Sequence, residues 1–153
     1  MAKNNIKIAL YQPDIPQNTA AVIRLCACFD TRLDIIEPTG FIMNDKRFKR
    51  ISMDYINNCE IKSYQNYEKF KNDRKNKRII LMTTKAKYKF HKFKFNNDDT
   101  ILFGRESLGV PEKIHESVDK KLLIPISKEV RSLNIVTSVA ITLSEALKQT
   151  FYI

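Results

Sequence analysis

The sequence predicts an α/β fold in which a mostly parallel sheet carries helices on both faces. Short apolar runs rich in β-branched residues alternate with segments of helical periodicity along the chain. No repeat, linker or change of composition divides the 153 residues. A chain of this length buries roughly 68 to 70% of its unfolded surface, enough for a core without disulfides. We therefore expect one domain over residues 1–153.

The strands are expected where apolar runs are short and bounded by turn residues. In chain order these runs are 6–12, 32–38, 78–84, 100–104 and 121–126, with a weaker sixth at 60–64. The helical patterns cover 18–29, 45–56, 65–71, a short stretch after Pro111, and 132–149. The polar tract at 71–78 is expected to be a surface loop. Ligands of such sheets bind beyond the carboxyl ends of the strands, so a site is expected after residues 84, 104 and 126.

The charge of the chain favours a polyanionic partner without requiring one. Lys and Arg number 27 against 17 Asp and Glu, a formal net charge of +10. A basic surface binds nucleic acid because neutralised phosphates release condensed counterions. Lys, Asn and Ile are all abundant, so part of this charge can equally be a solvated lysine surface of compositional origin.

The cysteines and histidines predict neither a disulfide framework nor a metal site. Cys26, Cys28 and Cys59 are odd in number and lack CxxC spacing. His91 and His115 lack ligand spacing, and we expect both at the surface.

A membrane or secreted protein is also disfavoured. The longest largely apolar segment, 133–143, is well short of the roughly 20 residues that span a bilayer. No charged leader followed by an apolar stretch and a cleavage site is visible. We expect a cytoplasmic protein without a membrane span.

Two of the three glycines fall in one short stretch, FGRESLGVP at 103–111. Gly104 ends a strand and Gly109 precedes the next helix, so each can allow a positive φ or bring a ligand against the main chain. Their GxxxxG spacing is that of a phosphate loop, but Val110 and Pro111 stand where Lys and Ser or Thr are required, so a phosphate loop is excluded. For either glycine alone, a tight turn with a C-cap glycine is the simpler interpretation.

The segment RSLNIVTSVAITLSEAL at 131–147 places polar residues just before or in the first turn of an apolar helix. Ser132 is a candidate N-cap, although Ile135 leaves the capping box incomplete. Asn134 precedes apolar residues, so we expect its amide to be partly buried and to need hydrogen-bond partners.

The helix predicted at 18–29 carries one charge, Arg24, on a surface that is apolar nearly all round. A guanidinium buried there needs an anion. That anion is either a carboxylate of this chain, such as Asp14 or Glu37, or a substrate phosphate or reacting oxygen. Asn18 is the expected N-cap of this helix.

Two basic segments are candidates for RNA contact. DKRFKR at 45–50 places Lys46, Arg47 and Arg50 on a helix, and for the arginines we favour RNA binding. KAKYKFHKFKF at 85–95 alternates bases with aromatic residues, which can stack on unpaired bases. For these aromatic residues we favour a simpler interpretation, in which they face the core and the lysines face water.

Three segments, taken in order, resemble the three motifs of the SPOUT-class RNA ribose 2′-O-methyltransferases: NTAAVIRLCA, FGRESLGVP and RSLNIVTSVAITLSEA. The likeness is greatest to the small tRNA enzymes of this family that modify the wobble nucleotide. IALYQPDIPQNT, RLDIIEPTGF, DKRFKR and LMTTK fit those enzymes as well, so the resemblance covers nearly the whole chain.

The resemblance implies a parallel α/β fold whose C-terminal third is threaded into a trefoil knot, and an obligate homodimer. It implies S-adenosylmethionine as cofactor and the ribose 2′-hydroxyl of the wobble nucleotide, in the anticodon loop of tRNA, as acceptor. Gly104 would let the main chain approach the cofactor, and Gly109 would shape the turn of the knot. Carried onto this sequence, the cofactor-binding residues of the family are Met82, Thr83, Gly104, Gly109, Ile124, Ser132 and Leu133.

The family motifs also assign the catalytic candidates. Arg24 matches the residue cast as base, but a guanidinium with a pKa above about 12 is a poor base in water. We therefore expect Arg24 to orient the 2′-hydroxyl and an adjacent phosphate, which can itself accept the proton. Glu106, Ser132 and Asn134 are expected to fix the geometry, with Asn18 beside them, because alignment at about 3 to 3.5 Å carries much of the rate.

The sequence departs from the family pattern at five positions. Ala20 replaces a Gly, Arg105 replaces a Pro, Val136 and Thr137 replace a Ser-Asn pair, and Ser144 replaces a Tyr. These changes bear on substrate choice more than on methyl transfer. Two alternatives therefore stay open, namely methylation of another tRNA or ribosomal RNA site, and a knotted RNA-binding dimer without catalysis.

Overall fold

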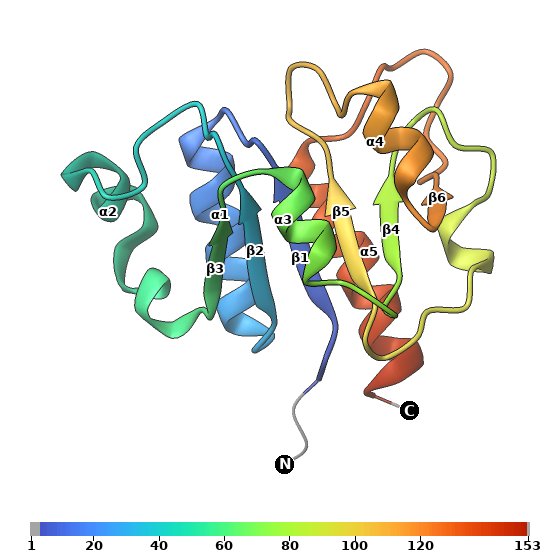
Figure 1. Cartoon of the computed structure of the whole chain (residues 1–153), viewed down its shortest axis with the longest axis horizontal. Helices are drawn as coiled ribbons and strands as arrows, with labels where there is room; N and C mark the ends of the chain where they lie inside the picture. Colours follow the sequence, from blue (N-terminus) through green and yellow to red (C-terminus); the bar gives the residue numbers. More distant parts are fainter. Residues whose placement is uncertain (1–3, 153) are drawn as a thin grey trace.

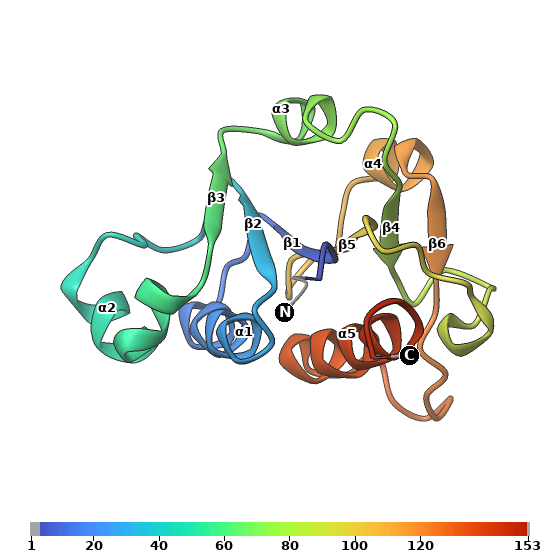
Figure 2. The ribbon, with the colours of Figure 1, turned by 90° about the horizontal axis from the view of Figure 1, so that it is seen from below.

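The structure, a computed structural model, describes residues 4–152, which form a parallel sheet with helices on both faces (Figures 1 and 2). The strands are β1 (Lys7–Tyr11), β2 (Arg32–Ile36), β3 (Ile61–Tyr64), β4 (Ile79–Met82), β5 (Thr100–Phe103) and β6 (Lys120–Leu122). The α-helices are α1 (Pro16–Cys28), α2 (Lys46–Ser52), α3 (Tyr67–Asn72), α4 (Glu112–Ser117) and α5 (Ile135–Thr150). Two 3₁₀ helices, η1 (Met53–Asn58) and η2 (Phe90–Lys92), complete the described elements.

The sheet has the order β3-β2-β1-β5-β4-β6, and every neighbouring pair is parallel. The chain therefore starts in the middle, builds β1 to β3 outward to one edge, and then builds the other half from β4 to β6. All carboxyl ends point to one side of the sheet, the top of Figure 1. The strand order reverses between β1 and β5, which is where sheets of this type bind ligands.

Two apolar layers flank the sheet, and Figure 2 shows the helices that cover its two faces. Alternate residues of β1 serve different layers: Ile8 and Leu10 pack with α1, α2 and α5, whereas Ala9 and Tyr11 pack with α3 and α4. Because both faces are covered, the central strands are apolar throughout. The prediction of helices on both faces is confirmed. Among the helices of residues 4–152, none is long and apolar enough to cross a membrane.

All six expected strands are present, most of them shorter than the apolar runs. The strand expected at 121–126 ends at Leu122. Beyond it, Leu123 pairs with the 88–90 segment instead: its N–H donates to the Tyr88 carbonyl at 2.8 Å and its carbonyl accepts from Phe90 N at 2.9 Å. The chain thereby leaves the sheet before Ile124, which frees residues 124–134 to form a loop.

The N-caps of two helices differ from the expectation. The first helix begins at Pro16 with Ile15 as N-cap, so Asn18 lies inside the first turn and its expected capping role is wrong. A proline at the first helical position has its φ already set for a helix, which moves the start ahead of Asn18.

In α5 the N-cap is Asn134 rather than Ser132. The Asn134 side chain accepts hydrogen bonds from Val136 N at 2.8 Å and Thr137 N at 3.4 Å. The prediction that this amide is partly buried is also wrong, because backbone donors satisfy its oxygen while the residue stays exposed.

The helix expected at 45–56 is interrupted. Asp45 caps α2 by accepting from Arg47 N at 2.7 Å, and α2 ends at Ser52. Met53 has a φ of 55°, outside the right-handed helical region, and the chain continues as the 3₁₀ helix η1.

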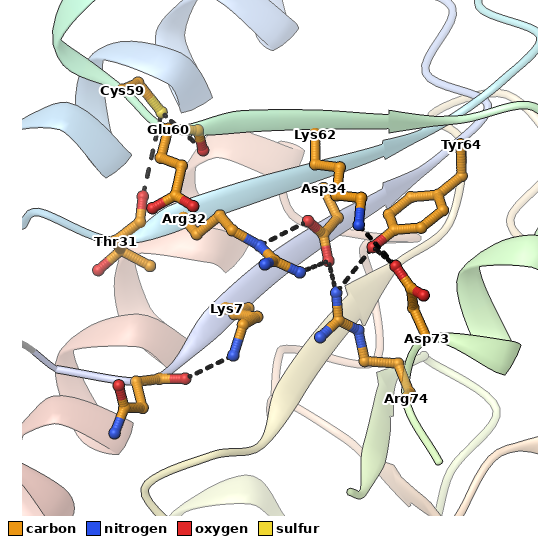
Figure 3. A network of polar contacts seen from close by, with 11 residues as sticks. Lys7, Thr31, Arg32, Asp34, Cys59, Glu60, Lys62, Tyr64, Asp73 and Arg74 are labelled. Carbon is orange, nitrogen blue, oxygen red and sulfur yellow. Dashed lines mark hydrogen bonds and ion pairs between the residues drawn. The ribbon is translucent and has the colours of Figure 1, made fainter.

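The tract at 71–78 contributes a buried arginine and is not purely a surface loop. Arg74 is 5% exposed and donates to Asp34 at 2.6 Å and to the Tyr64 hydroxyl at 3.1 Å (Figure 3). Asp34 is fully buried and also accepts two hydrogen bonds from Arg32, at 2.9 and 3.2 Å. This network joins β2, β3 and the end of α3, so it holds the β1–β3 half of the sheet together.

The aromatic residues of 85–95 mostly pack inward. Phe95 is buried, and Phe90 and Phe93 are partly buried against the core, which confirms the simpler interpretation for these three. Gln149 of α5 anchors the segment, accepting from Phe95 N at 2.8 Å and donating to the Phe93 carbonyl at 2.9 Å. Tyr88 is the exception and is exposed, because its ring rests on the edge of Phe93 at the surface.

Candidate active site

A pocket of about 480 Å³ lies at the carboxyl ends of β4 and β5, beside the loop that follows β6. Its walls come from residues 81–85, from the turn at 103–110, from the loop after β6, and from the start of α5. This volume is within the range of sites for small molecules and cofactors. The pocket therefore lies beyond the carboxyl ends of the strands, where a ligand of such a sheet is expected.

Every residue expected to bind the cofactor lines this pocket. Three separate loops bring them together, which explains why they are far apart in the sequence. They are Met82, Thr83, Gly104, Gly109, Ile124, Ser132 and Leu133. Their roles in binding stay predictions.

The two neighbouring glycines have a shared structural cause. A Cβ on Gly104 would lie 2.6 Å from the carbonyl carbon of Gly109, closer than side chains approach a backbone. Gly109 has a φ of +67°, which favours glycine. Two hydrogen bonds close the turn, from Arg105 N to Gly109 O at 3.1 Å and from Gly109 N to Arg105 O at 2.8 Å. Gly104 is thus needed by the turn itself, whatever its distance from a ligand.

Four of the five catalytic candidates meet where α1 and α5 begin. Glu106, Ser132 and Asn134 line the pocket. The Asn134 amide nitrogen lies 3.5 Å from the Asn18 side-chain oxygen, which links the first turn of α1 to the pocket rim.

Arg24 lies away from these residues. It is exposed on α1, and its guanidinium lies over the Tyr55 ring at 4.9 Å from the ring centre. The expectation of a buried guanidinium is wrong, because α1 buries one face and leaves Arg24 on the other. Within residues 4–152 no carboxylate forms an ion pair with Arg24, so the alternative of an internal ion pair is also wrong.

Two carboxyl groups meet beside the pocket. The Asp14 N–H donates to Glu106 Oε2 at 3.0 Å, and Ser107 Oγ donates to Asp14 Oδ2 at 2.5 Å. Arg105 Nε lies 3.7 Å from the same Asp14 oxygen. Hydrogen bonding to Glu106 lowers the pKa of Asp14, whereas burial, followed by the hydrogen bond to Asp14, raises the pKa of Glu106. The two groups titrate as a pair in which Glu106 holds its proton more tightly.

The candidates for RNA contact are exposed but distant from the pocket. Lys46, Arg47 and Arg50 are exposed on α2, where Arg47 lies 3.5 Å from Asp45. In both views α2 and β6 lie at opposite ends of the molecule (Figures 1 and 2). Within one chain these residues therefore do not approach the pocket.

His115 is a pocket residue that the sequence did not indicate. We expected it at the surface, but it is only 8% exposed, and its Nε2 lies 3.2 Å from Thr83 Oγ1. The available signal was its place in a short helix directly after the glycine turn, where α4 packs back on the end of β4. His91 is exposed, as expected. Within residues 4–152 no three His, Cys, Asp or Glu side chains form a group that could hold a metal.

The chain has relatives along nearly its whole length. A family model described as the SpoU rRNA Methylase family matches residues 5–144. A tRNA (cytidine(34)-2′-O)-methyltransferase of Beijerinckia indica is 42% identical over 144 residues, covering 93% of this chain and 90% of that protein. One from Escherichia coli K12 is 34% identical over 149 residues, covering 96% and 95%.

A solved structure has the same fold as this chain. It is described as giving structural insights into the 2-OH methylation of C/U34 on tRNA, and it superimposes with a TM-score of 0.90 at 30% identity. The match covers 95% of this chain and 96% of that one.

Proposed function

The chain belongs to the SpoU rRNA Methylase family, and we propose that it methylates the ribose 2′-hydroxyl of nucleotide 34, the wobble position, of tRNA. One observation carries the proposal: relatives named for this activity align with nearly the whole chain, including the segments that form the pocket. A tRNA substrate also agrees with the formal charge of +10. A cytoplasmic location is part of the same proposal.

The pocket fits S-adenosylmethionine, the cofactor of this reaction. Met82, Ile124 and Leu133 give it apolar walls, and Thr83 and Ser132 add hydroxyl groups. Glu106 adds a carboxyl group to the pocket wall, beside the turn in which Gly104 and Gly109 carry no side chain over the main chain. When bound, S-adenosylmethionine supplies an electrophilic methyl group on a sulfonium.

The side chains at the rim then orient the acceptor hydroxyl. Asn134 uses its oxygen to cap α5, so only its amide N–H groups are available to a substrate. Glu106 has its pKa moved upward, toward neutrality, which suits it to accept a hydrogen bond from the 2′-hydroxyl and to take the proton as it leaves. The guanidinium of Arg24 is assigned to the substrate phosphate, which it can bind with two parallel hydrogen bonds.

A homodimer is part of the proposal because Arg24 does not reach the pocket of its own chain. Figure 2 shows α1 and α5 side by side, and Ile15 at the start of α1 and Ile141 in α5 leave apolar surface exposed, 40% and 37%. A second copy packed on these helices buries that surface and brings Arg24 of one protomer to the pocket of the other. The trefoil knot of the C-terminal third stays a prediction.

Mixing two inactive variants tests the shared site. Arg24→Ala and Asn134→Ala chains should each be inactive alone and should regain activity when mixed dimers form, because one of the two pockets then has both residues intact. A mixture that stays inactive, with exchange of protomers verified by mass, would contradict a site built from two chains.

The acceptor is tested with one altered tRNA. Tritiated S-adenosylmethionine and unmodified tRNA should give methyl transfer that maps to nucleotide 34, and the same tRNA with 2′-deoxyribose at position 34 should accept none. Ribosomal RNA serves as the control substrate. Transfer that survives the deoxyribose substitution, or that prefers ribosomal RNA, would reject nucleotide 34 as the acceptor.

A further inference from the structure

His115 occupies an unusual place for an imidazole, because it is almost fully buried at a pocket wall. It lies in α4, which begins directly after the turn closed by Arg105 and Gly109. It is 8% exposed and lines the pocket together with Thr83, from which its Nε2 is separated by 3.2 Å. Since the carboxyl ends of β4 and β5 are adjacent, α4 brings His115 back over the end of β4.

The backbone of Thr83 is fixed independently of His115. Thr83 follows β4 directly, and its N–H donates to the Leu122 carbonyl at 2.9 Å. This backbone hydrogen bond does not fix the direction of the Thr83 O–H bond. The hydroxyl hydrogen can rotate, so its direction depends on the groups that bond to the oxygen.

Two donors meet at the Thr83 hydroxyl oxygen. Lys85 N donates to it at 3.2 Å, and His115 Nε2, when it carries a proton, donates at the same distance of 3.2 Å. A hydroxyl has two acceptor lone pairs and one proton. With both lone pairs occupied, the proton is all that Thr83 can offer to a ligand.

We propose that His115 is a positioning residue for the cofactor site: its Nε2–H occupies the second lone pair of Thr83 Oγ1, so that the Thr83 hydroxyl becomes a hydrogen-bond donor to S-adenosylmethionine. This inference rests on the proposed function, because it assigns the pocket to that cofactor. His115 itself does not touch the reacting atoms.

A double-mutant cycle read by calorimetry tests the coupling. S-adenosylmethionine is titrated into the native dimer and into His115→Leu, Thr83→Val and the double variant. Each single change should weaken binding by about two- to tenfold, the range of one hydrogen bond. The double variant should bind no more weakly than Thr83→Val alone, because His115 acts through that hydroxyl.

Two conservative variants separate positioning from packing. His115→Gln keeps an N–H donor and should restore most of the affinity lost in His115→Leu, and Thr83→Ser keeps the hydroxyl and should bind like the native chain. Thermal unfolding without ligand checks that each variant is folded. If His115→Leu proves unfolded, the cofactor affinity of His115→Gln is compared with the affinities of Thr83→Val and Thr83→Ser. A His115→Gln chain that binds as weakly as Thr83→Val would overturn the role of His115.

The outcomes distinguish this inference from the proposed function. Losses that add in the double variant, or a His115→Gln chain as weak as His115→Leu, would overturn the role of His115 while the native chain still binds cofactor. Failure of the native chain to bind S-adenosylmethionine would overturn the proposed function, and this inference with it.

Discussion

The two halves of the sheet contribute differently to the site. The β4–β6 half forms the pocket, and every residue expected to bind the cofactor lies there within one chain. The β1–β3 half carries Arg24 and the basic residues of α2, which are exposed and lie away from that pocket. The walls of the pocket therefore come from one chain, whereas the residues proposed to contact RNA lie away from the pocket of that chain.

The interior of the two halves differs as well. A buried ion network centred on Asp34 holds the β1–β3 half (Figure 3). Both oxygens of Asp34 accept hydrogen bonds from arginines, so this carboxylate stabilises the scaffold. Beside the pocket, Glu106 instead shares its surroundings with a second carboxyl group, Asp14, and its pKa is raised. Four substitutions test this contrast.

The largest effect is expected at Asp34. Asp34→Asn leaves the buried guanidinium of Arg74 without its anion, and breaking such a pair costs about 3–5 kcal/mol of unfolding free energy. Urea denaturation measures the loss. Lys62→Ala, which removes a pair with Asp73 that is about half exposed, is the matched control and should cost far less unfolding free energy than Asp34→Asn, because water screens exposed pairs. Cofactor affinity of the folded Asp34→Asn chain should be unchanged, and a parallel loss would contradict the division into two halves.

The next effect is expected at Arg24. Arg24→Ala should lower the methylation rate by about a hundredfold or more, since it removes the group proposed to align the acceptor. Binding of S-adenosylmethionine, measured by calorimetry, should stay native. Arg24→Lys keeps the charge without the planar fork and should fall between the two. An active Arg24→Ala enzyme would remove this residue from the mechanism.

A smaller effect is expected at Gly104. Gly104→Ala places a methyl group against the Gly109 backbone, and such overpacking costs about 1–3 kcal/mol. Stability and cofactor affinity should fall together, because the displaced turn is a pocket wall. In Gly109→Ala the new methyl group meets no atom within 4 Å, so only the backbone strain of about 1 kcal/mol is expected. A Gly104→Ala chain with native stability would show that the turn can shift at no cost.

The smallest effect concerns pH. The pKa of Glu106 is raised above its usual 4.5, so ionising this group in the folded chain costs free energy. That cost is absent at pH values below 4.5 and grows until the pH exceeds the raised pKa. Gln cannot ionise, so the stability of Glu106→Gln relative to the native chain should rise as the pH increases above 4.5 and should level off once the pH exceeds the raised pKa of Glu106. Urea denaturation across this range checks the trend, and a difference independent of pH would contradict the raised pKa.

Part of the pocket could be predicted because several of its residues come directly after a strand. Once the apolar runs at 78–84 and 100–104 are placed as parallel strands, Thr83 and Gly104 must lie at one edge of the sheet. The resemblance to a known family added the residues of the 124–134 loop, which leaves the sheet and cannot be placed by periodicity.

The surroundings of Arg24, Asn134 and His115 depend on tertiary contacts that cannot be predicted from sequence patterns. The apolar surface around Arg24 predicts burial, but a second copy of the chain can also cover such a surface, and Arg24 is exposed in one chain. The apolar residues after Asn134 predict buried partners, whereas the neighbouring backbone N–H groups bond its oxygen. His115 carried no spacing signal, and only the return of α4 over β4 brings it to Thr83.

We propose that the methyl donor binds in the pocket of the β4–β6 half. The most direct measurement is an NMR experiment in which S-adenosylmethionine, labelled with ¹³C in its transferable methyl group, is bound to the methyl-protonated protein. We expect nuclear Overhauser effects between the ligand and the methyl groups of Met82, Ile124 and Leu133. A bound ligand without contacts to these three residues, or no bound ligand at all, would contradict this assignment.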